Sequence, residues 1–172
     1  ILHKKGEEQE AFAAYDSCLQ WKDDNVMALN NYAYYLSEKG VDLHKAEAMS
    51  YKTIKAEPNN GTYLDTYAWI LFMEERYADA KTYIDQALKN RDSTADNSTV
   101  LEHAGDIYYM NGIADESVDF WKKAYTGENQ TEVLAWKIKN RQYITEEELK
   151  KRNAPKQKVA ATKKSVRKGK KK

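Results

Sequence analysis

The sequence has few of the residues that cross-link chains, end helices or cross membranes. Its 172 residues include one cysteine and two prolines. The single cysteine, Cys18, excludes a disulfide within the chain, and its place in a helical pattern predicts a buried, inert thiol. No apolar run approaches the roughly 20 residues that a membrane-spanning helix needs, so none is predicted. The hydrophobic content of 41% is still enough for a real core in a chain of this length.

The motifs of common catalytic and metal sites are also missing. The sequence has no Gly-rich phosphate loop, no His-Glu-x-x-His motif and no paired cysteines. Glu102, His103 and Asp106 fall within about one helical turn, but adjacent helical side chains point about 100° apart, and a transition metal would need further ligands. His44 near Glu47 is interpreted as an exposed pair on a helix. The sequence therefore predicts neither an enzyme nor a cofactor.

Acidic residues are absent from the last part of the chain. Residues 150–172 hold 12 of the 28 Lys and Arg residues, which leaves 16 basic against 27 acidic residues in 1–149, a net charge of −11. Val159 and Val166 are the sizeable aliphatic residues of this final segment, so we expect it to be mobile on its own. The formal net charge of +1 therefore hides an acidic body with a basic tail.

The basic tail is open to three interpretations. It is a solvated, solubilising end, or it binds nucleic acid or an anionic membrane surface, or it contacts the acidic body of its own or a neighbouring chain. The tail has no aromatic residue to stack on a base, so any nucleic-acid contact should be nonspecific and sensitive to salt.

What the chain does contain is a pattern of small and larger side chains that returns about every 35 residues. The starts of the four copies are 35, 34 and 37 residues apart, which is typical of a helix–turn–helix array. The copies are Ala11-Tyr15-Cys18, Ala46-Ser50-Thr53, Ala80-Ile84-Ala87 and Ser117-Trp121-Ala124.

Glycine and proline occur where such an array needs turns. Gly40 suits the turn between two helices, because glycine adopts the left-handed conformation cheaply, and Pro58 ends a repeat. Asn111-Gly112 predicts the corresponding turn of the fourth unit, whereas the third unit has Glu75-Arg76 there and no glycine. Gly105 falls inside a helix, where glycine costs about 1 kcal/mol relative to alanine, and we expect close approach of the paired helix there.

The register of the repeats divides the chain into segments. We expect the chain to be a piece of a longer protein, because its first unit has only a second helix, Gly6 to Gln20. A final helix from about Thr131 to Tyr143 should cover the open end, and Thr145 with Glu148 has capping-box spacing for one more turn. The expected segments are 1–25 (truncated repeat), 26–59, 60–93 and 94–128 (full repeats), 129–149 (capping helix) and 150–172 (basic tail).

With these small-residue positions and turns, the repeats resemble the tetratricopeptide repeat family. They are similar in particular to the C-terminal parts of bacterial proteins that contain many such repeats. Asp23 and Asp92 stand where the family's pattern has the proline that Pro58 supplies. The resemblance implies an all-α, right-handed superhelical solenoid of antiparallel helix pairs, here with a C-terminal capping helix. It is carried by residues 29–36 (LNNYAYYL), 63–69 (YLDTYAW) and 102–109 (EHAGDIYY), together with the small-residue positions.

The resemblance also implies that one side of each first helix lines a concave groove. The implied lining is Asn30, Asn31, Tyr34 and Glu38, then Asp65, Thr66, Trp69, Phe72 and Met73, then Glu102, His103, Asp106, Tyr109 and Met110. Helical spacing independently predicts that one face of this helix differs from the face that meets the partner helix. The first face holds Asp65, Trp69, Phe72 and Met73, and the second holds Leu64, Ala68 and Leu71. A helix that is apolar on two faces is buried on both or binds a partner with one, and we favour binding.

The implied lining indicates the chemistry of a partner. It has acids but no Lys or Arg, which argues against a clamp for a terminal carboxylate and favours a protein or peptide with basic and apolar side chains. Trp69 is the best anchor, and Asn31 could hydrogen-bond an extended backbone. We therefore predict a scaffold or adaptor that binds a protein partner. In the alternative, the basic tail binds nucleic acid or an anionic surface and the repeats only assemble the complex. The open face of the first hairpin favours self-association.

Overall fold

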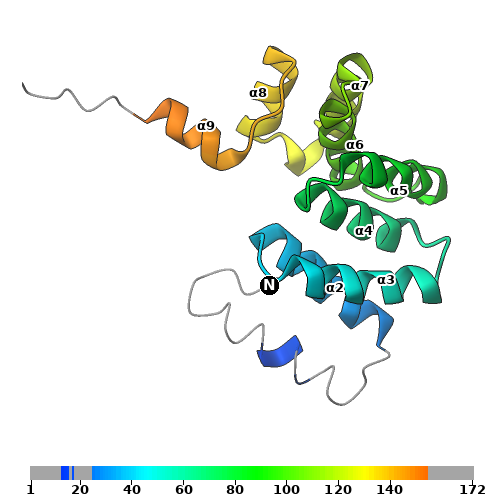
Figure 1. The fold of residues 1–172 in the computed structure, drawn as a ribbon. Helices are drawn as coiled ribbons and strands as arrows, with labels where there is room; N and C mark the ends of the chain where they lie inside the picture. The colour runs from blue at the N-terminus through cyan, green and yellow to red at the C-terminus, as the bar shows by residue number, and fades with distance from the viewer. Residues whose placement is uncertain (1–12, 16, 18–24, 155–172) are drawn as a thin grey trace, which may run out of the picture.

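The structure is a computed structural model that describes residues 13–15, 17 and 25–154, and all regular structure in this part is helical (Figure 1). Most of the expected helix at Gly6–Gln20, and residues 155–172 of the tail, lie outside the described residues. No helix within the described ranges combines the length and apolar character needed to span a membrane. The elements are α2 (Val26–Lys39), α3 (Leu43–Ala56), α4 (Gly61–Met73), α5 (Tyr77–Asn90), α6 (Ser98–Met110), α7 (Ala114–Ala124), the 3₁₀ turn η1 (Gly127–Asn129), α8 (Glu132–Asn140) and α9 (Glu146–Asn153).

Consecutive helices pair, and the pairs stack side by side (Figure 1). The most extensive contacts join α2 with α3, α4 with α5, and α6 with α7. Between pairs, α3 packs on α4 and α5 on α6, while α2, α4 and α6 contact one another in sequence as a layer of first helices. The predicted all-α solenoid of helix pairs is confirmed.

The repeating small-residue pattern marks the places where the paired helices touch. In the three copies that the structure describes in full, every member of the pattern has no exposed surface. A small side chain at these positions lets the second helix approach the first, and the longer apolar side chains of the first helices fill the space beside it. These fully buried members are Ala46, Ser50, Thr53, Ala80, Ile84, Ala87, Ser117, Trp121 and Ala124.

Gly105 confirms the expected close approach of a paired helix. A Cβ atom built on this residue would lie 2.3 Å from Cδ1 and 2.4 Å from Nε1 of Trp121. The indole of α7 thus occupies the space that any side chain at residue 105 would need, which explains a glycine in the middle of α6.

The three hairpin turns use the same left-handed backbone conformation, but only two of them have glycine there. Gly40 has φ of 64° and Gly112 has φ of 77°, and Glu75 adopts φ of 61° at the equivalent place after α4. A side chain in this conformation costs about 1–2 kcal/mol because Cβ approaches the following carbonyl oxygen. The turn without glycine therefore keeps the shared geometry and carries local strain.

Two further helices follow the last repeat. The side chain of Thr131 caps α8, and Leu134, Ile144 and Leu149 are buried. The predicted capping box is confirmed: the Thr145 hydroxyl accepts a hydrogen bond from the Glu148 backbone N–H, and the Glu148 carboxylate accepts one from the Thr145 backbone N–H.

The helical structure extends further than the segment boundaries drawn from the sequence. Residues 150–153, expected as part of the basic tail, belong to α9. The salt bridges Lys150–Glu146 and Lys151–Glu147, one helical turn apart, link them to the start of that helix. The scarcity of aliphatic residues in this segment gave no sign of α9, because a cap and ion pairs hold this helix.

Replacing Glu75 with glycine should stabilise the protein. The substitution removes the left-handed penalty at φ 61°, and the greater unfolded-state freedom of glycine cancels about 0.5–1 kcal/mol of the gain. We expect the free energy of unfolding in urea to rise by up to about 1 kcal/mol. Glu75→Ala is the matched control, because alanine loses the same carboxylate and keeps the penalty. Equal stability of the two variants would contradict the strain argument.

Candidate protein-interaction groove

A groove of about 880 Å³ lies between the first helices of the repeats and the two C-terminal helices. Seven of the residues expected to line a groove do so: Tyr34, Glu38, Trp69, Met73, Glu102, His103 and Asp106. Helices α8 and α9 supply the opposite wall through side chains such as Lys137 and Leu149, and Ile144 between them contributes as well. The C-terminal helices were expected to cover the end of the solenoid, and they also form one side of this groove.

A second hollow of about 580 Å³ contains the remaining polar residues of the expected lining. Asn30, Asn31, Asp65 and Thr66 lie here, together with the loops at residues 59–62 and 90–92, and Tyr34 lines both hollows. The expected continuous groove is therefore divided into an aromatic and acidic part, called here the aromatic groove, and a part rich in asparagine, called here the asparagine hollow.

Phe72 and Tyr109 line neither of these two hollows. Phe72 is buried in the core, edge-on to Tyr77 and Tyr143. Tyr109 packs beside Trp121 and Tyr143. The side chain of Tyr143, from the connection between α8 and α9, packs against both rings and separates them from the aromatic groove, with Tyr109 remaining half-buried.

Trp69 is held in place by ring stacking and by a hydrogen bond. Its indole stacks on Phe72, at 4.7 Å between ring centroids and 10° between planes, and on His103, at 4.1 Å and 13°. Its Nε1 donates to the Glu38 carboxylate at 2.9 Å. Tyr34 lies tilted against His103, with centroids 6.1 Å apart. The half-buried indole is thus fixed before any partner arrives.

His103 connects the two hollows through a buried ion pair with Asp65. Nδ1 of His103 lies 2.9 Å from Oδ1 of Asp65, and both side chains are almost fully enclosed. Burial alone would lower the pKa of His103, but the nearby carboxylates, Asp65 first, outweigh it and raise the pKa. Burial also raises the pKa of Tyr34, with Glu38 adding to the shift. The imidazole is therefore engaged with a carboxylate from the neighbouring repeat.

Lys137 also lines the aromatic groove, although the lining expected from the sequence did not include it. Its ammonium group, on α8, donates to both oxygens of Asp106 at 2.7 and 2.8 Å and to Glu102 at 3.1 Å. The Trp121 indole N–H also donates to Asp106, at 2.8 Å. Lys137 and Asp106 are each only 3% exposed. The expectation of a groove lining without lysine is therefore wrong.

The ionisation of Asp106 reflects two opposing effects. Burial raises the pKa of Asp106, while the Lys137 ammonium and the Trp121 N–H oppose that shift.

The sequence contained a signal for the burial of Lys137, since this residue follows the buried Leu134 by three residues and shares its helix face. His103 is thus bound to Asp65, whereas Asp106 and Glu102 share the ammonium group of Lys137.

Comparison with known proteins identifies similar repeat proteins. No known family model matches the chain. A TPR repeat-containing protein of Pseudomonas aeruginosa is 35% identical over 66 residues, which are 38% of this chain and 11% of that protein. The NMR structure of the first TPR domain of the human RPAP3 protein is similar with a TM-score of 0.57 at 13% identity, over 67% of this chain and 88% of that domain. The matched segment thus spans about a tenth of the length of the bacterial relative.

Removing the Lys137 charge should destabilise the fold strongly. Lys137→Met leaves the buried Asp106 carboxylate without its cation, and breaking such a pair costs about 3–5 kcal/mol. The measurement is the free energy of unfolding in urea. Lys139→Met, an exposed lysine of the same helix, is the matched control and should change stability by less than about 0.5 kcal/mol. Adding Asp106→Asn to Lys137→Met should recover part of the loss. Equal effects of the two lysine variants would contradict the buried pair.

His103 should make stability depend on pH near neutrality. Because its folded pKa lies above the usual 6.5, its charge stabilises the fold fully below that value. The contribution is lost as the pH rises through the folded pKa. We therefore expect the stability difference between wild type and His103→Gln to be larger at acidic than at alkaline pH. Urea unfolding of both proteins over pH 5.5–8.5 tests this, and a difference that does not vary with pH would contradict it.

Proposed function

We propose that the chain, whose described helix pairs have the fold of tetratricopeptide repeats, is a protein-interaction module, a scaffold or adaptor without chemistry of its own. Its aromatic groove receives a peptide or helical segment of a partner protein. The fold similarity to repeat domains supports the general role. The groove itself supports the more specific proposal, because it is a concave surface with few, fixed anchors.

The observation that carries the proposal is the fixed and still accessible indole of Trp69. A partner that binds over it meets a ring that Phe72, His103 and Glu38 already hold, so little side-chain entropy is lost on binding. Tryptophan in such a setting is the residue type that most often dominates binding energy. Met73 beside it adds an adaptable apolar contact.

The charges around the groove favour a partner segment with lysine or arginine. Lys137 is already bound by Asp106 and Glu102, so the carboxylates of Glu38, Glu132 and Glu146 outnumber the ammonium of Lys150 on the rest of the lining. A negative concave surface attracts basic segments and makes their association rate sensitive to salt. The proposed ligand therefore combines an apolar side chain for Trp69 and Met73 with a basic one for Glu38.

The asparagine hollow offers a place for the backbone of the same segment. Asn30 is only 5% exposed, and its Oδ1 has no hydrogen-bond partner within the described part of the chain. A buried carbonyl oxygen without a donor is costly, and an N–H from a bound strand or loop would satisfy it. The exposed Asn31 next to it adds a second polar contact. In this proposal the ligand runs from the aromatic groove past Tyr34 into the asparagine hollow.

Truncating Trp69 should weaken partner binding strongly. We expect Trp69→Ala to weaken binding by at least about tenfold, because hot-spot truncations lose 2 kcal/mol or more. The measurement is affinity capture from a lysate of the source cell with identification by mass spectrometry, followed by titration of the recovered partner. Tyr51→Ala is the matched control, since Tyr51 is an exposed aromatic residue of α3 that lines neither hollow. Circular dichroism checks that both variants are folded.

A truncated bait distinguishes binding by the groove from binding by the basic tail. A chain that ends at Ala154 keeps α9 and loses nine basic residues. Capture that survives this truncation and disappears with Trp69→Ala supports the groove. Capture that disappears with the tail, falls steeply with salt and ignores Trp69→Ala would replace the proposal with tail-driven binding to nucleic acid or an anionic surface.

A further inference from the structure

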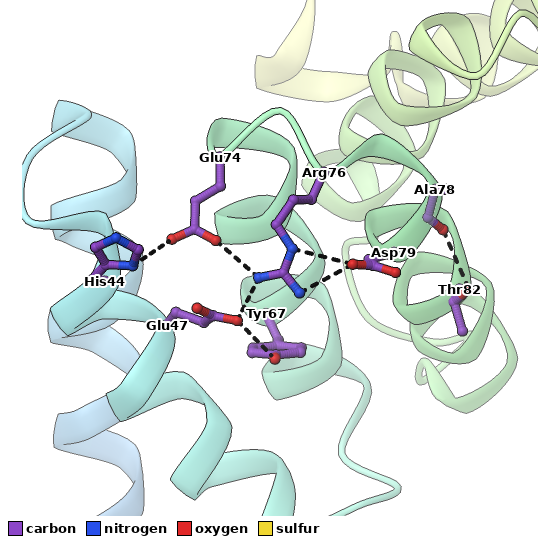
Figure 2. Close-up of polar contacts among 8 residues, drawn as sticks. All are labelled: His44, Glu47, Tyr67, Glu74, Arg76, Ala78, Asp79 and Thr82. Carbon is purple, nitrogen blue, oxygen red and sulfur yellow. Dashed lines mark hydrogen bonds and ion pairs between the residues drawn. The ribbon is translucent and has the colours of Figure 1, made fainter.

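Three side chains of residue types that commonly bind metals meet where the first complete hairpin packs on the next one. His44 and Glu47 lie one turn apart on α3, and Glu74 directly follows α4 (Figure 2). One ligand atom from each of the three lies within 4.8 Å of the other two. None of the three residues lines either hollow. The cluster therefore joins two neighbouring repeats and is independent of the groove.

Glu74 contributes an oxygen that is buried and unsatisfied. Its side chain is only 11% exposed, and among the described residues Oε1 has no hydrogen-bond partner. His44 Nδ1 lies 3.6 Å from it, which is too long for a hydrogen bond. A carboxylate oxygen shielded from water in this way needs a cation or a donor.

Arg76 holds both carboxylates from the opposite side. Its Nη1 donates to Glu47 Oε1 at 2.7 Å and to Glu74 Oε2 at 3.2 Å, and the Tyr67 hydroxyl also donates to Glu47 Oε1, at 3.3 Å. The other oxygen of Glu47 lies on the side of the carboxylate that faces His44, and Oε1 of Glu74 faces His44 as well (Figure 2). Both ligands are thus oriented by outer contacts, as metal-binding carboxylates usually are.

The local charge matches a divalent cation. Arg76 also binds Asp79, through Nε at 3.2 Å and Nη2 at 3.1 Å. Three carboxylates, Glu47, Glu74 and Asp79, therefore surround a single guanidinium, and the group has a net charge of −2 while His44 is neutral. One divalent ion on the His44 side would balance this charge without displacing the arginine.

We propose that His44, Glu47 and Glu74 form a binding site for a divalent transition-metal ion of the zinc class. One imidazole and two carboxylates are zinc ligands, with metal–ligand distances of about 2.0–2.2 Å, so tetrahedral ligands lie about 3.3 Å apart. The 3.6 Å between His44 Nδ1 and Glu74 Oε1 is close to that value. Calcium and magnesium are disfavoured because they take oxygen ligands in larger number. Water completes the coordination, and the ion fastens α3 to the α4–α5 turn.

The test is a zinc titration of the full chain without a histidine tag, in competition with a chromogenic chelator. We expect one Zn²⁺ per chain and a melting temperature that rises with zinc, because the ion binds only the folded site. His44→Gln should weaken binding by at least about tenfold, as should Glu47→Gln and Glu74→Gln. His44 is 99% exposed, so its replacement leaves the fold intact. Cobalt absorption spectra report whether the coordination is tetrahedral.

Two controls match the substituted residues. Glu75→Gln changes the neighbouring carboxylate in the same turn, and His3→Gln changes a histidine that the proposed ligand set does not include. Both should leave zinc affinity unchanged. Three outcomes would each overturn the proposal. The wild-type chain binds Zn²⁺ more weakly than millimolar, His44→Gln binds Zn²⁺ as tightly as the wild type, or Glu75→Gln loses as much zinc affinity as His44→Gln. None of these outcomes bears on Trp69, so the groove and the metal site succeed or fail separately.

Discussion

The close approach of paired helices at the small-residue positions is the constraint on which the rest of the structure depends. Ala46, Ala80 and Ser117 occupy the same place in three successive hairpins and have no exposed surface. A larger side chain there would separate the helices, and the angle between each hairpin and the next would change. Between α6 and α7 the sizes are exchanged: the small residue, Gly105, is on the first helix, and the large ring of Trp121 is on the second. Repeating one packing contact places the first helices side by side.

The buried contact between Lys137 and Asp106 turns this layer of helices into a groove. By binding Asp106 on α6, the lysine fixes α8 against the last repeat, and α9 follows as the second part of the wall. An ion pair in a core adds little net stability over an apolar pair, but its geometry is demanding. The complete pair therefore determines where α8 lies, whereas removing only one partner leaves a buried charge unpaired and is strongly destabilising. Lys137 also removes two carboxylates from the surface that a partner meets.

Polar pairs between repeats occur on both sides of the solenoid. His103 with Asp65 connects α6 to α4 at the groove, and Arg76 with Glu47 connects the α4–α5 turn to α3 away from it (Figure 2). Apolar packing alone would tolerate small changes of angle between hairpins, whereas these directional contacts fix them. The stacked Trp69 depends on this, because one of its two neighbours, His103, comes from the next repeat.

Local periodicity, turn residues and small-residue spacing within about 35 residues were enough to predict the helices, their pairing and the repeat length. The sequence also identified Trp69, His103 and Glu102 as groove residues, since each first helix has an outer face that its own hairpin does not bury. Three contacts became known from the folded chain alone: Lys137 neutralises Asp106, Tyr143 packs against Phe72 and Tyr109, and Glu74 lies against His44. These contacts join residues from different repeats or from the capping segment. Their existence depends on the angles at which whole hairpins stack, and no local pattern encodes those angles.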